Sequence, residues 1–317
     1  MAVFTPLSRA QLERWLERYD LGRLVDVQGI AAGIENSNFF VDTQRGRYVL
    51  TLFERLAAHE LPFYLELMHH LAAAGVPCPD PVADRGGAAL GTLAGKPAAL
   101  VTRLAGAAIE RPGRGHCAQV GQVLARMHLA AADYGAVQVN PRGPAWWPTA
   151  LAELDPFFTP AQRSLAREET ERFARFAAGP SHRALAASAV HADLFRDNVL
   201  FDGETLAGVI DFYFAATETW LFDLAVACND WCIDPDTGEL DPGLLAALLG
   251  GYRAIRDLGA GEREAWPTML RGAATRFWLS RMHDLHLPRP AQLVRPKDPG
   301  HFERILRARR TRVPPID

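Results

Sequence analysis

The spacing of apolar residues in the first hundred positions predicts a small sheet with helices beside it. Alternating or β-branched runs predict strands at residues 25–30, 38–43, 48–53, 82–83 and 98–104. Apolar residues at helical spacing predict a helix at 8–19, which Ser8 can cap, and another at 57–74. Pro62 falls in the first turn of that second helix or breaks it. We therefore expect a small antiparallel sheet with a helix packed beside it.

After Gly106 the pattern becomes mainly helical. Apolar residues at helical spacing predict helices at residues 116–132, 160–178, 220–232, 242–258, 263–285 and 299–310. Only residues 198–214 have a β-like pattern, which is typical of a hairpin. Together these patterns predict an α+β fold with two lobes, a small N-terminal lobe at 1–105 and a larger, mainly helical lobe at 106–317.

The composition is that of a globular protein and narrows the choice of partners. The 317 residues are 49% hydrophobic and 22% charged, with a formal net charge of -3, so no basic field favours nucleic acid or an anionic membrane. The arginines near the C-terminus fit a solvated helix face better than a nucleic-acid contact. No apolar run approaches the roughly 20 residues of a membrane span, and the N-terminus lacks the pattern of a secretory signal. We expect small-molecule partners, with no nucleic acid and no membrane.

The cysteines indicate a reducing compartment. Cys78, Cys117, Cys228 and Cys232 are too few and too scattered for a disulfide scaffold. Only the last two lie at helical spacing, and no further Cys or His stands nearby in the sequence to complete a metal site. We therefore expect reduced, buried thiols and a cytoplasmic location.

The strongest chemical signal is a group of polar residues around the predicted hairpin. Its turn lies near residues 203–204, so Asn198 and Asp211 fall at the open end, on strands that lie about 4.8 Å apart. Their amide and carboxylate oxygens suit Mg²⁺ that takes its remaining ligands from water and phosphate. Asp193, on the preceding loop, can point at the same centre without binding the ion. Phosphoryl transfer requires this combination of a carboxylate to accept a hydroxyl proton and an Asn and an Asp to hold metal.

Each of these residues alone has a simpler explanation, because Asp and Asn are common in turns and His191 could be a core histidine. The combination is harder to dismiss. The pattern His-x-Asp-x4-Asn, followed by a hairpin and Ile-Asp-Phe, matches the catalytic loop and later metal-binding Asp of protein kinases. On these motifs the chain resembles the aminoglycoside phosphotransferase and choline kinase superfamily, which are protein-kinase-like enzymes that act on small molecules.

Within that superfamily the chain resembles the homoserine kinases of bacterial threonine biosynthesis. The stretches that carry this narrower resemblance span both lobes: GIENSNFFV (33–41), YVLTLFE (48–54), ELPFYLELMHHLAAAGVPCPDPV (60–82), HADLFRDNVLF (191–201), IDFYFA (210–215), DLAVACNDWC (223–232) and RFWLSRMHDLHLPR (276–289). The resemblance implies ATP- and Mg²⁺-dependent phosphorylation of the hydroxyl of L-homoserine, giving O-phospho-L-homoserine. It leaves the oligomeric state open.

The resemblance also implies roles for the residues of the second lobe. Asp193 would be the catalytic base, and Asn198 and Asp211 would hold Mg²⁺. His191 and Asp223 would support the catalytic loop without taking part in the chemistry.

In the first lobe, the loop at 29–38 would cover the nucleotide, and the residues expected to bind it there are Gly33, Asn36, Ser37 and Asn38. The same composition is also typical of an ordinary hairpin turn. Residues 102–106, which include Arg103 and Ala105, would form a hinge whose backbone pairs with adenine.

One position departs from the protein-kinase pattern. The third strand of those enzymes carries a lysine that binds phosphate, whereas the matching residue here is Thr51. Neither lysine of the chain, Lys96 nor Lys297, lies near it in the sequence. The homoserine kinases that the chain resembles also tend to have Thr here. The negative charge of the phosphates would then be neutralised by Mg²⁺, loop amides or an arginine.

Homoserine is a zwitterion, so its site needs an acid near the ammonium and a donor near the carboxylate. Several polar residues after Asp211 are candidates, including Arg276. We expect Asp230 to hold the ammonium and Arg281 the carboxylate, with Tyr213 also at the substrate. A solvated salt bridge is the simpler explanation for each of the charged residues.

Two other functions fit the same motifs. The substrate could be another alcohol, such as choline, which needs an aromatic cage, an aminoglycoside, which needs an acidic cleft, or a sugar. The chain could instead be a catalytically inactive kinase-fold binding module. Thr51 favours that alternative, while the presence of Asp193, Asn198 and Asp211 opposes it.

Overall fold

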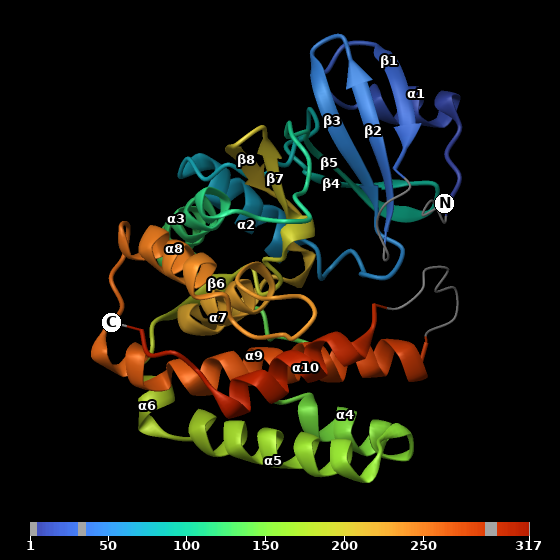
Figure 1. Ribbon diagram of the computed structural model, residues 1–317. Helices are drawn as coiled ribbons and strands as arrows, with labels where there is room; N and C mark the ends of the chain where they lie inside the picture. The colour runs from blue at the N-terminus through green and yellow to red at the C-terminus, as the bar shows by residue number, and fades with distance from the viewer. Residues whose placement is uncertain (1–4, 31–35, 289–296, 317) are drawn as a thin grey trace. The chain divides into compact units, whose positions relative to one another are not determined.

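The computed structural model describes residues 5–30, 36–288 and 297–316. These residues form two compact units, the first ending at Ala105 and the second beginning at Gly106. The ribbon in Figure 1 shows a sheet-rich first unit and a mainly helical second unit. An α+β fold is therefore confirmed.

The first unit is built on one antiparallel sheet. Its strands are β1 (Leu24–Gly29), β2 (Ser37–Thr43), β3 (Gly46–Leu52), β4 (Leu90–Leu93) and β5 (Lys96–Thr102), in the spatial order β1-β2-β3-β5-β4. Two helices accompany it, α1 (Arg9–Leu16) and α2 (Pro62–Ala73). Ser8 caps α1 as expected, and Pro62 occupies the first turn of α2, where its missing N–H costs nothing.

Strand β2 shows how this sheet divides its side chains between two faces. Phe39 and Val41 are buried in a core that includes Leu12 and Trp15 of α1. Because side chains alternate along a strand, Ser37 shares their face, whereas Asn38 lies on the opposite face. The two neighbouring residues of the expected nucleotide loop therefore point to different sides of the sheet.

The second unit is mostly helical. Its helices are α3 (Arg114–Ala130), α4 (Trp147–Leu154), α5 (Pro160–Ala177), α6 (Pro180–Arg183), α7 (Trp220–Trp231), α8 (Pro242–Arg253), α9 (Ala260–His286) and α10 (Pro299–Thr311). Helix α9 is the centre of the packing, because α4, α5, α7 and α10 all lie against it (Figure 1). Side chains along this long helix can therefore contact several different helices of the unit.

Two short strand pairs complete the second unit. Strand β7 (Val199–Asp202) pairs with β8 (Thr205–Val209) in the predicted hairpin, and β6 (Ala187–Val190) pairs with β9 (Ala216–Thr219). The prediction that only the hairpin would be β-structure was therefore wrong. Strand β6 has only four residues, Ala-Ser-Ala-Val, and their small side chains give no alternating hydrophobic pattern. Its partner β9 follows the hairpin, so the two strands are also well separated in the sequence.

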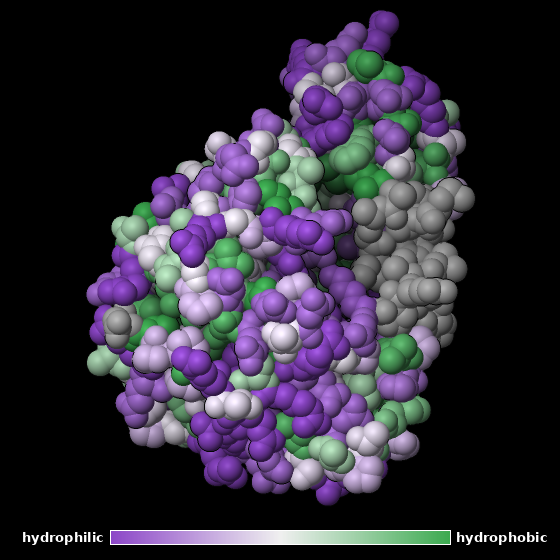
Figure 2. Space-filling model, viewed as in Figure 1, coloured by the Kyte–Doolittle hydropathy of each residue, from purple (hydrophilic) through white to green (hydrophobic). Residues whose placement is uncertain are grey.

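The arginines of α10 are tied into the unit by ion pairs and hydrogen bonds. Arg307 lies 2.7 Å from Glu303, Arg310 lies 2.8 Å from Glu168, and buried Arg309 donates to Asn229. The face over α9 and α10 is mainly hydrophilic, with small apolar patches (Figure 2). In the described part of the chain, no helix is both long and apolar enough to cross a membrane.

Helices α3 and α8 cross at a pair of glycines. A Cβ atom on Gly121 would lie 2.0 Å from the carbonyl oxygen of Leu248, and one on Gly251 would lie 2.0 Å from the carbonyl oxygen of Ala118. Both contacts are with backbone, which cannot rotate aside as a side chain can. The crossing therefore depends on the absence of a side chain at both positions.

We predict that Gly121→Ala or Gly251→Ala lowers the free energy of unfolding by about 1–3 kcal/mol, because the helices must separate to admit the methyl group. Gly250→Ala is the matched control, since its Cβ would meet nothing within 4 Å. There alanine should be neutral or stabilise by up to about 1 kcal/mol through helix propensity. Urea unfolding of the three variants measures this difference, and equal effects at positions 250 and 251 would contradict the packing described.

Candidate active site

The loop that follows β6 carries Asp193 and begins in an unusual conformation. Ala192 has φ of 62°, in the left-handed region that residues with a Cβ seldom adopt. The 3-10 turn η3 (Arg196–Asn198) then leads directly into β7. Asp193 thus lies between a strained residue and the start of the hairpin.

A buried carboxylate from α7 holds this loop. Asp223 is 0% exposed and accepts hydrogen bonds from the backbone N–H of His191 at 3.1 Å and of Ala192 at 2.8 Å. The Nε2 atom of His128, on α3, lies 3.1 Å from the same carboxylate and donates to it. A buried charge needs several donors to replace its hydration, and Asp223 obtains them from His128 and from two successive backbone N–H groups that lead into the strained residue.

His191 links the loop to the far strand of the hairpin. Its Nε2 donates to the carbonyl oxygen of Ile210 at 3.0 Å, and its Nδ1 accepts from the N–H of Asp193 at 3.3 Å. Burial lowers the pKa of His191, which favours the neutral ring that this pattern of one donor and one acceptor requires. The histidine therefore aligns Asp193 with the residue that precedes Asp211.

The hairpin brings the three predicted oxygen-bearing side chains together. Val199 pairs with Val209, and the N–H of Ile210 donates to the carbonyl oxygen of Asn198 at 2.9 Å. Asn198 therefore lies directly before β7, and Asp211 lies just after β8, at the same open end of the hairpin. The Nδ2 atom of Asn198 donates to the carbonyl oxygen of Asp193 at 2.8 Å and lies 3.4 Å from its carboxylate. Asp211 also has a left-handed backbone, with φ of 64°.

Burial and charged neighbours together set the pKa of Asp193. Burial raises the pKa of Asp193 to about 7, and the carboxylate of Asp211 adds to this effect. Arg276 opposes the rise, with its Nη1 atom 3.7 Å from the Asp193 carboxylate. Asp193 is 17% exposed, so it can still meet a ligand.

Arg276 is a functional candidate that the sequence offered only as one of several polar residues. Its side chain is 4% exposed, its Nε atom has no hydrogen-bond partner, and burial lowers its pKa to about 10. A buried guanidinium with an unsatisfied N–H is costly. The signal in the sequence was an arginine inside the apolar run of α9, next to Phe277 and Trp278.

The donor atoms present fit a magnesium ion that is shared with phosphate. Among the described residues, no group of three or more His, Cys, Asp and Glu side chains could hold a metal ion alone. Asn198 and Asp211 supply two hard oxygen donors, and the bond from Nδ2 of Asn198 to Asp193 leaves its Oδ1 as the atom able to bind a cation. Two protein ligands with water and phosphate are a common set for Mg²⁺.

The expected nucleotide loop is described in part. Gly33 lies outside the described residues, while Asn36 accepts from the N–H of Glu54 at 3.4 Å. The buried hydroxyl of Ser37 donates to Glu54 at 2.6 Å, on the α1 face of the sheet, so that hydroxyl is already engaged. Asn38, on the other face, accepts from the hydroxyl of Thr51 at 2.9 Å.

Lys96 lies closer to this loop than its place in the sequence suggested. Its Nζ atom is 3.2 Å from the carboxylate of Glu54, which also binds Ser37. At the other end of β2, Arg103 lies over the ring of Phe40 at 3.8 Å and 3.6 Å from Asp42.

Ala105, the last residue of the first unit, is exposed and has no side chain that could bind a ligand. Only its backbone could serve in a hinge that pairs with adenine.

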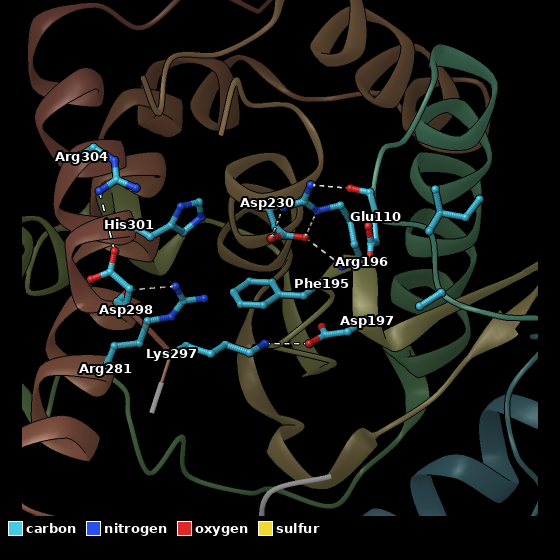
Figure 3. Close-up of a pocket in the computed structure, with 12 residues that line it drawn as sticks. Glu110, Phe195, Arg196, Asp197, Asp230, Arg281, Lys297, Asp298, His301 and Arg304 are labelled. Carbon is cyan, nitrogen blue, oxygen red and sulfur yellow. Dashed lines mark hydrogen bonds and ion pairs between the residues drawn. The ribbon is translucent and has the colours of Figure 1, made fainter. Parts of the chain in front are cut away.

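A cavity of about 600 Å³ lies within the second unit, next to the loop (Figure 3). Asp230 and Arg281 both line it, whereas Tyr213 does not. Arg196 donates hydrogen bonds to the carboxylate of Asp230 from its backbone N–H at 2.8 Å and from its Nε at 3.1 Å. Arg281 donates to the carbonyl oxygen of Asp298 at 3.3 Å. Neither Arg196 nor Asp298 had been singled out from the sequence.

The chain matches known phosphotransferases along most of its length. A model of the phosphotransferase enzyme family matches residues 26–258. The homoserine kinase of Burkholderia multivorans (strain ATCC 17616 / 249) is 52% identical over 324 residues, which cover 100% of this chain and 98% of that protein. The homoserine kinase of Burkholderia thailandensis is 53% identical over 317 residues, which cover 98% of this chain and 96% of that protein.

Solved structures share the fold at low sequence identity. An amicoumacin kinase in complex with AMP-PNP, Ca²⁺ and its ligand superposes with a TM-score of 0.69 at 13% identity, covering 96% of this chain and 92% of that chain. A spectinomycin phosphotransferase in complex with ADP and spectinomycin gives a TM-score of 0.66 at 14% identity, covering 95% and 94%. These similarities show a kinase-like fold, as the resemblance implied.

The raised pKa of Asp193 predicts a pH-dependent stability of the metal-free protein. An unfolded chain releases the proton of this residue near its ordinary pKa of 3.8, whereas the folded chain retains it to about 7. Because the folded chain binds this proton more tightly than the unfolded chain, the free energy of unfolding falls as the pH rises from about 4 to about 7. Asp193→Asn does not titrate, so it should gain stability relative to wild type between about pH 4 and about pH 8, by about 4 kcal/mol at most.

Urea unfolding of both proteins in EDTA, at the two ends of this range, measures the effect. The informative quantity is the change in their difference with pH, because any fixed effect of the substitution cancels. An offset that is the same at both pH values would contradict the desolvated environment described for Asp193.

Proposed function

The chain belongs to the phosphotransferase enzyme family, and we propose that it transfers the γ-phosphoryl group of ATP to the hydroxyl of L-homoserine, giving O-phospho-L-homoserine. The observation that carries the choice of substrate is the 52% identity to a homoserine kinase across 100% of this chain. The protein would then act in threonine biosynthesis. The four free, buried cysteines agree with a cytoplasmic setting.

Asp193 supplies the base. The hydroxyl of homoserine gives its proton to the Asp193 carboxylate as its oxygen attacks the γ-phosphorus in line. One P–O bond forms to the substrate, and the P–O bond to ADP breaks. A carboxylate with a pKa of about 7 is matched to this task near neutral pH. Arg276, 3.7 Å away, favours the ionised form that must be present before the reaction.

Asn198 and Asp211 hold Mg²⁺ in this proposal. An ion held there would supply positive charge to offset the charge that develops on the phosphate and on the departing ADP. The hydrogen bond from Asn198 to Asp193 fixes the amide with Oδ1 available for the ion. The amicoumacin kinase complex, which contains AMP-PNP and Ca²⁺, supports the use of a divalent cation by this fold.

The nucleotide lies along the first unit. Asn36 and Asn38 contact the phosphates, and the backbone near Arg103 and Ala105 pairs with adenine; the role expected for Gly33 falls outside the described residues. The hydroxyl of Ser37 is buried against Glu54, so this side chain does not contact the phosphates directly. Ser37 would instead help to position the neighbouring residues of the loop.

The carboxylate of homoserine binds Arg281. Among the described residues, no carboxylate lies within 4 Å of this guanidinium, although it lines the cavity and is half-buried. Burial lowers the pKa of Arg281, which shows that its charge is poorly solvated. A ligand carboxylate would supply the missing neutralisation. Tyr213, which does not line this cavity, would be a further substrate contact outside it.

The experiment that tests this function is incubation of the purified protein with Mg-ATP and L-homoserine, with the product identified by ³¹P NMR. Phosphohomoserine should form, and Asp193→Asn should lower kcat by about 10²–10⁴-fold because proton transfer is lost. Choline, an aminoglycoside and a simple sugar are the comparison substrates. Turnover with one of these instead of homoserine would overturn the substrate, and turnover that survives in Asp193→Asn would remove Asp193 from its role.

A further inference from the structure

The ion pairs around the cavity show which of its charges are already neutralised. Arg196 pairs with Asp230, Lys297 with Asp197, and Arg304 with Asp298, as Figure 3 shows. Arg281 alone among the described arginines and lysines of the wall has no carboxylate partner. The cavity therefore offers one unpaired cation for a ligand carboxylate. Of its acids, Asp197, Asp230 and Asp298 have basic partners. Among the described residues, no ion pair reaches the exposed side chain of Glu110, which lies beyond Arg196 from Arg281 (Figure 3).

Asp230 is poorly suited to the ammonium, contrary to the expectation from the sequence. Its side chain is 8% exposed, and three donors of Arg196 already surround its two oxygens. A ligand ammonium would have to displace a chelating guanidinium, which binds a carboxylate in a fixed fork. Asp230 instead fixes Arg196 and, through it, the loop.

Asp197 is the better candidate for binding the substrate ammonium, because it already binds an ammonium group, that of Lys297. It stands on η3 next to Asn198, four residues after Asp193. Its carboxylate accepts a hydrogen bond from the Nζ atom of Lys297 at 2.7 Å. Both side chains are accessible, at 56% for Asp197 and 46% for Lys297. Pairs this exposed are weak and open readily.

An aromatic cluster lies beneath these cations. Phe302 stacks on Phe277 and on Phe195, with ring centroids 5.0 Å and 5.7 Å apart, and Phe195 packs against Phe277 in a tilted arrangement at 4.5 Å. Lys297 places its ammonium 5.7 Å from the centroid of Phe195, and Arg281 places its guanidinium 4.5 Å from the centroid of Phe302. The two cations thus lie over neighbouring rings, whose faces attract positive charge.

We propose that Asp197 and the face of Phe195 form the ammonium subsite for the amino-acid substrate, and that Lys297 occupies this subsite in the free protein. The substrate's α-ammonium displaces that of Lys297, while the substrate's carboxylate pairs with Arg281. This assignment rests on the proposed function and adds to it the residues that select an α-amino acid. Lys297 is a built-in competitor that the substrate must replace.

The proposal makes opposite predictions for the two members of the pair. Lys297→Met removes the competitor, so KM for homoserine should fall by about 2- to 5-fold, the scale of an exposed ion pair. Asp197→Asn removes the acceptor, so KM should rise by about 10- to 100-fold, with a smaller change in kcat. In the double variant the benefit of Lys297→Met should disappear, because there is no longer a site for either ammonium.

A second substrate separates ammonium recognition from general effects. 4-Hydroxybutyrate has the hydroxyl and carboxylate of homoserine but no ammonium, so Asp197→Asn should change its KM less than about 3-fold. Arg304→Gln is the matched control for loss of a positive charge from the same wall, since Arg304 has Asp298 as its own partner. This control should leave KM for homoserine within about 2-fold of wild type.

Steady-state kinetics of these variants, after thermal melts have verified that each is folded, test the assignment. An increase of KM in Lys297→Met would mean that Lys297 binds the substrate, and equal losses on both substrates in Asp197→Asn would mean that Asp197 acts on the loop. Either result overturns the subsite alone. If the wild type forms no phosphohomoserine, the proposed function fails and the subsite falls with it.

Discussion

The site depends on one buried carboxylate and the backbone that it holds. Asp223 accepts hydrogen bonds from two successive backbone N–H groups, at His191 and Ala192, and from His128. Without it these donors would be buried and unpaired, which is among the more expensive defects in a protein interior. With it, the chain can pass through a left-handed residue and turn Asp193 toward the hairpin. The geometry of the candidate active site therefore depends on how this buried backbone is hydrogen-bonded, which fixes the position of Asp193.

Several unfavourable features are gathered within this small region. Ala192 and Asp211 both have positive φ. Burial raises the pKa of Asp193 to about 7, which opposes its ionisation, and the Nε atom of Arg276 has no hydrogen-bond partner. Strain and poor solvation of this kind persist only where the surrounding structure fixes them, and they concentrate at functional sites. The rest of the unit, with its well-packed helix crossing at Gly121 and Gly251, offsets this cost.

Local sequence predicted the parts of the site that local structure builds. The turn at residues 203–204 sets the approximate register of the hairpin, so Asn198 and Asp211 could be expected at its open end. The register shift between Leu200 and Phe201 could not be expected from the turn. Contacts from distant elements could not be foreseen in this way. Arg276 reaches Asp193 from α9, Arg196 takes the carboxylate of Asp230, and β6 finds its partner across the hairpin. Each of these contacts joins segments that are far apart in the sequence, and apolar spacing alone does not determine which segments meet.

The most direct test of this account is amide hydrogen exchange in Asp223→Asn, an isosteric change that replaces one acceptor with a donor. The account predicts that the amides of His191 and Ala192 lose at least about 10-fold of their protection while those of α8 keep theirs, because only the loop is released. If both amides stay as protected as in the wild type, the loop is held by something other than this carboxylate.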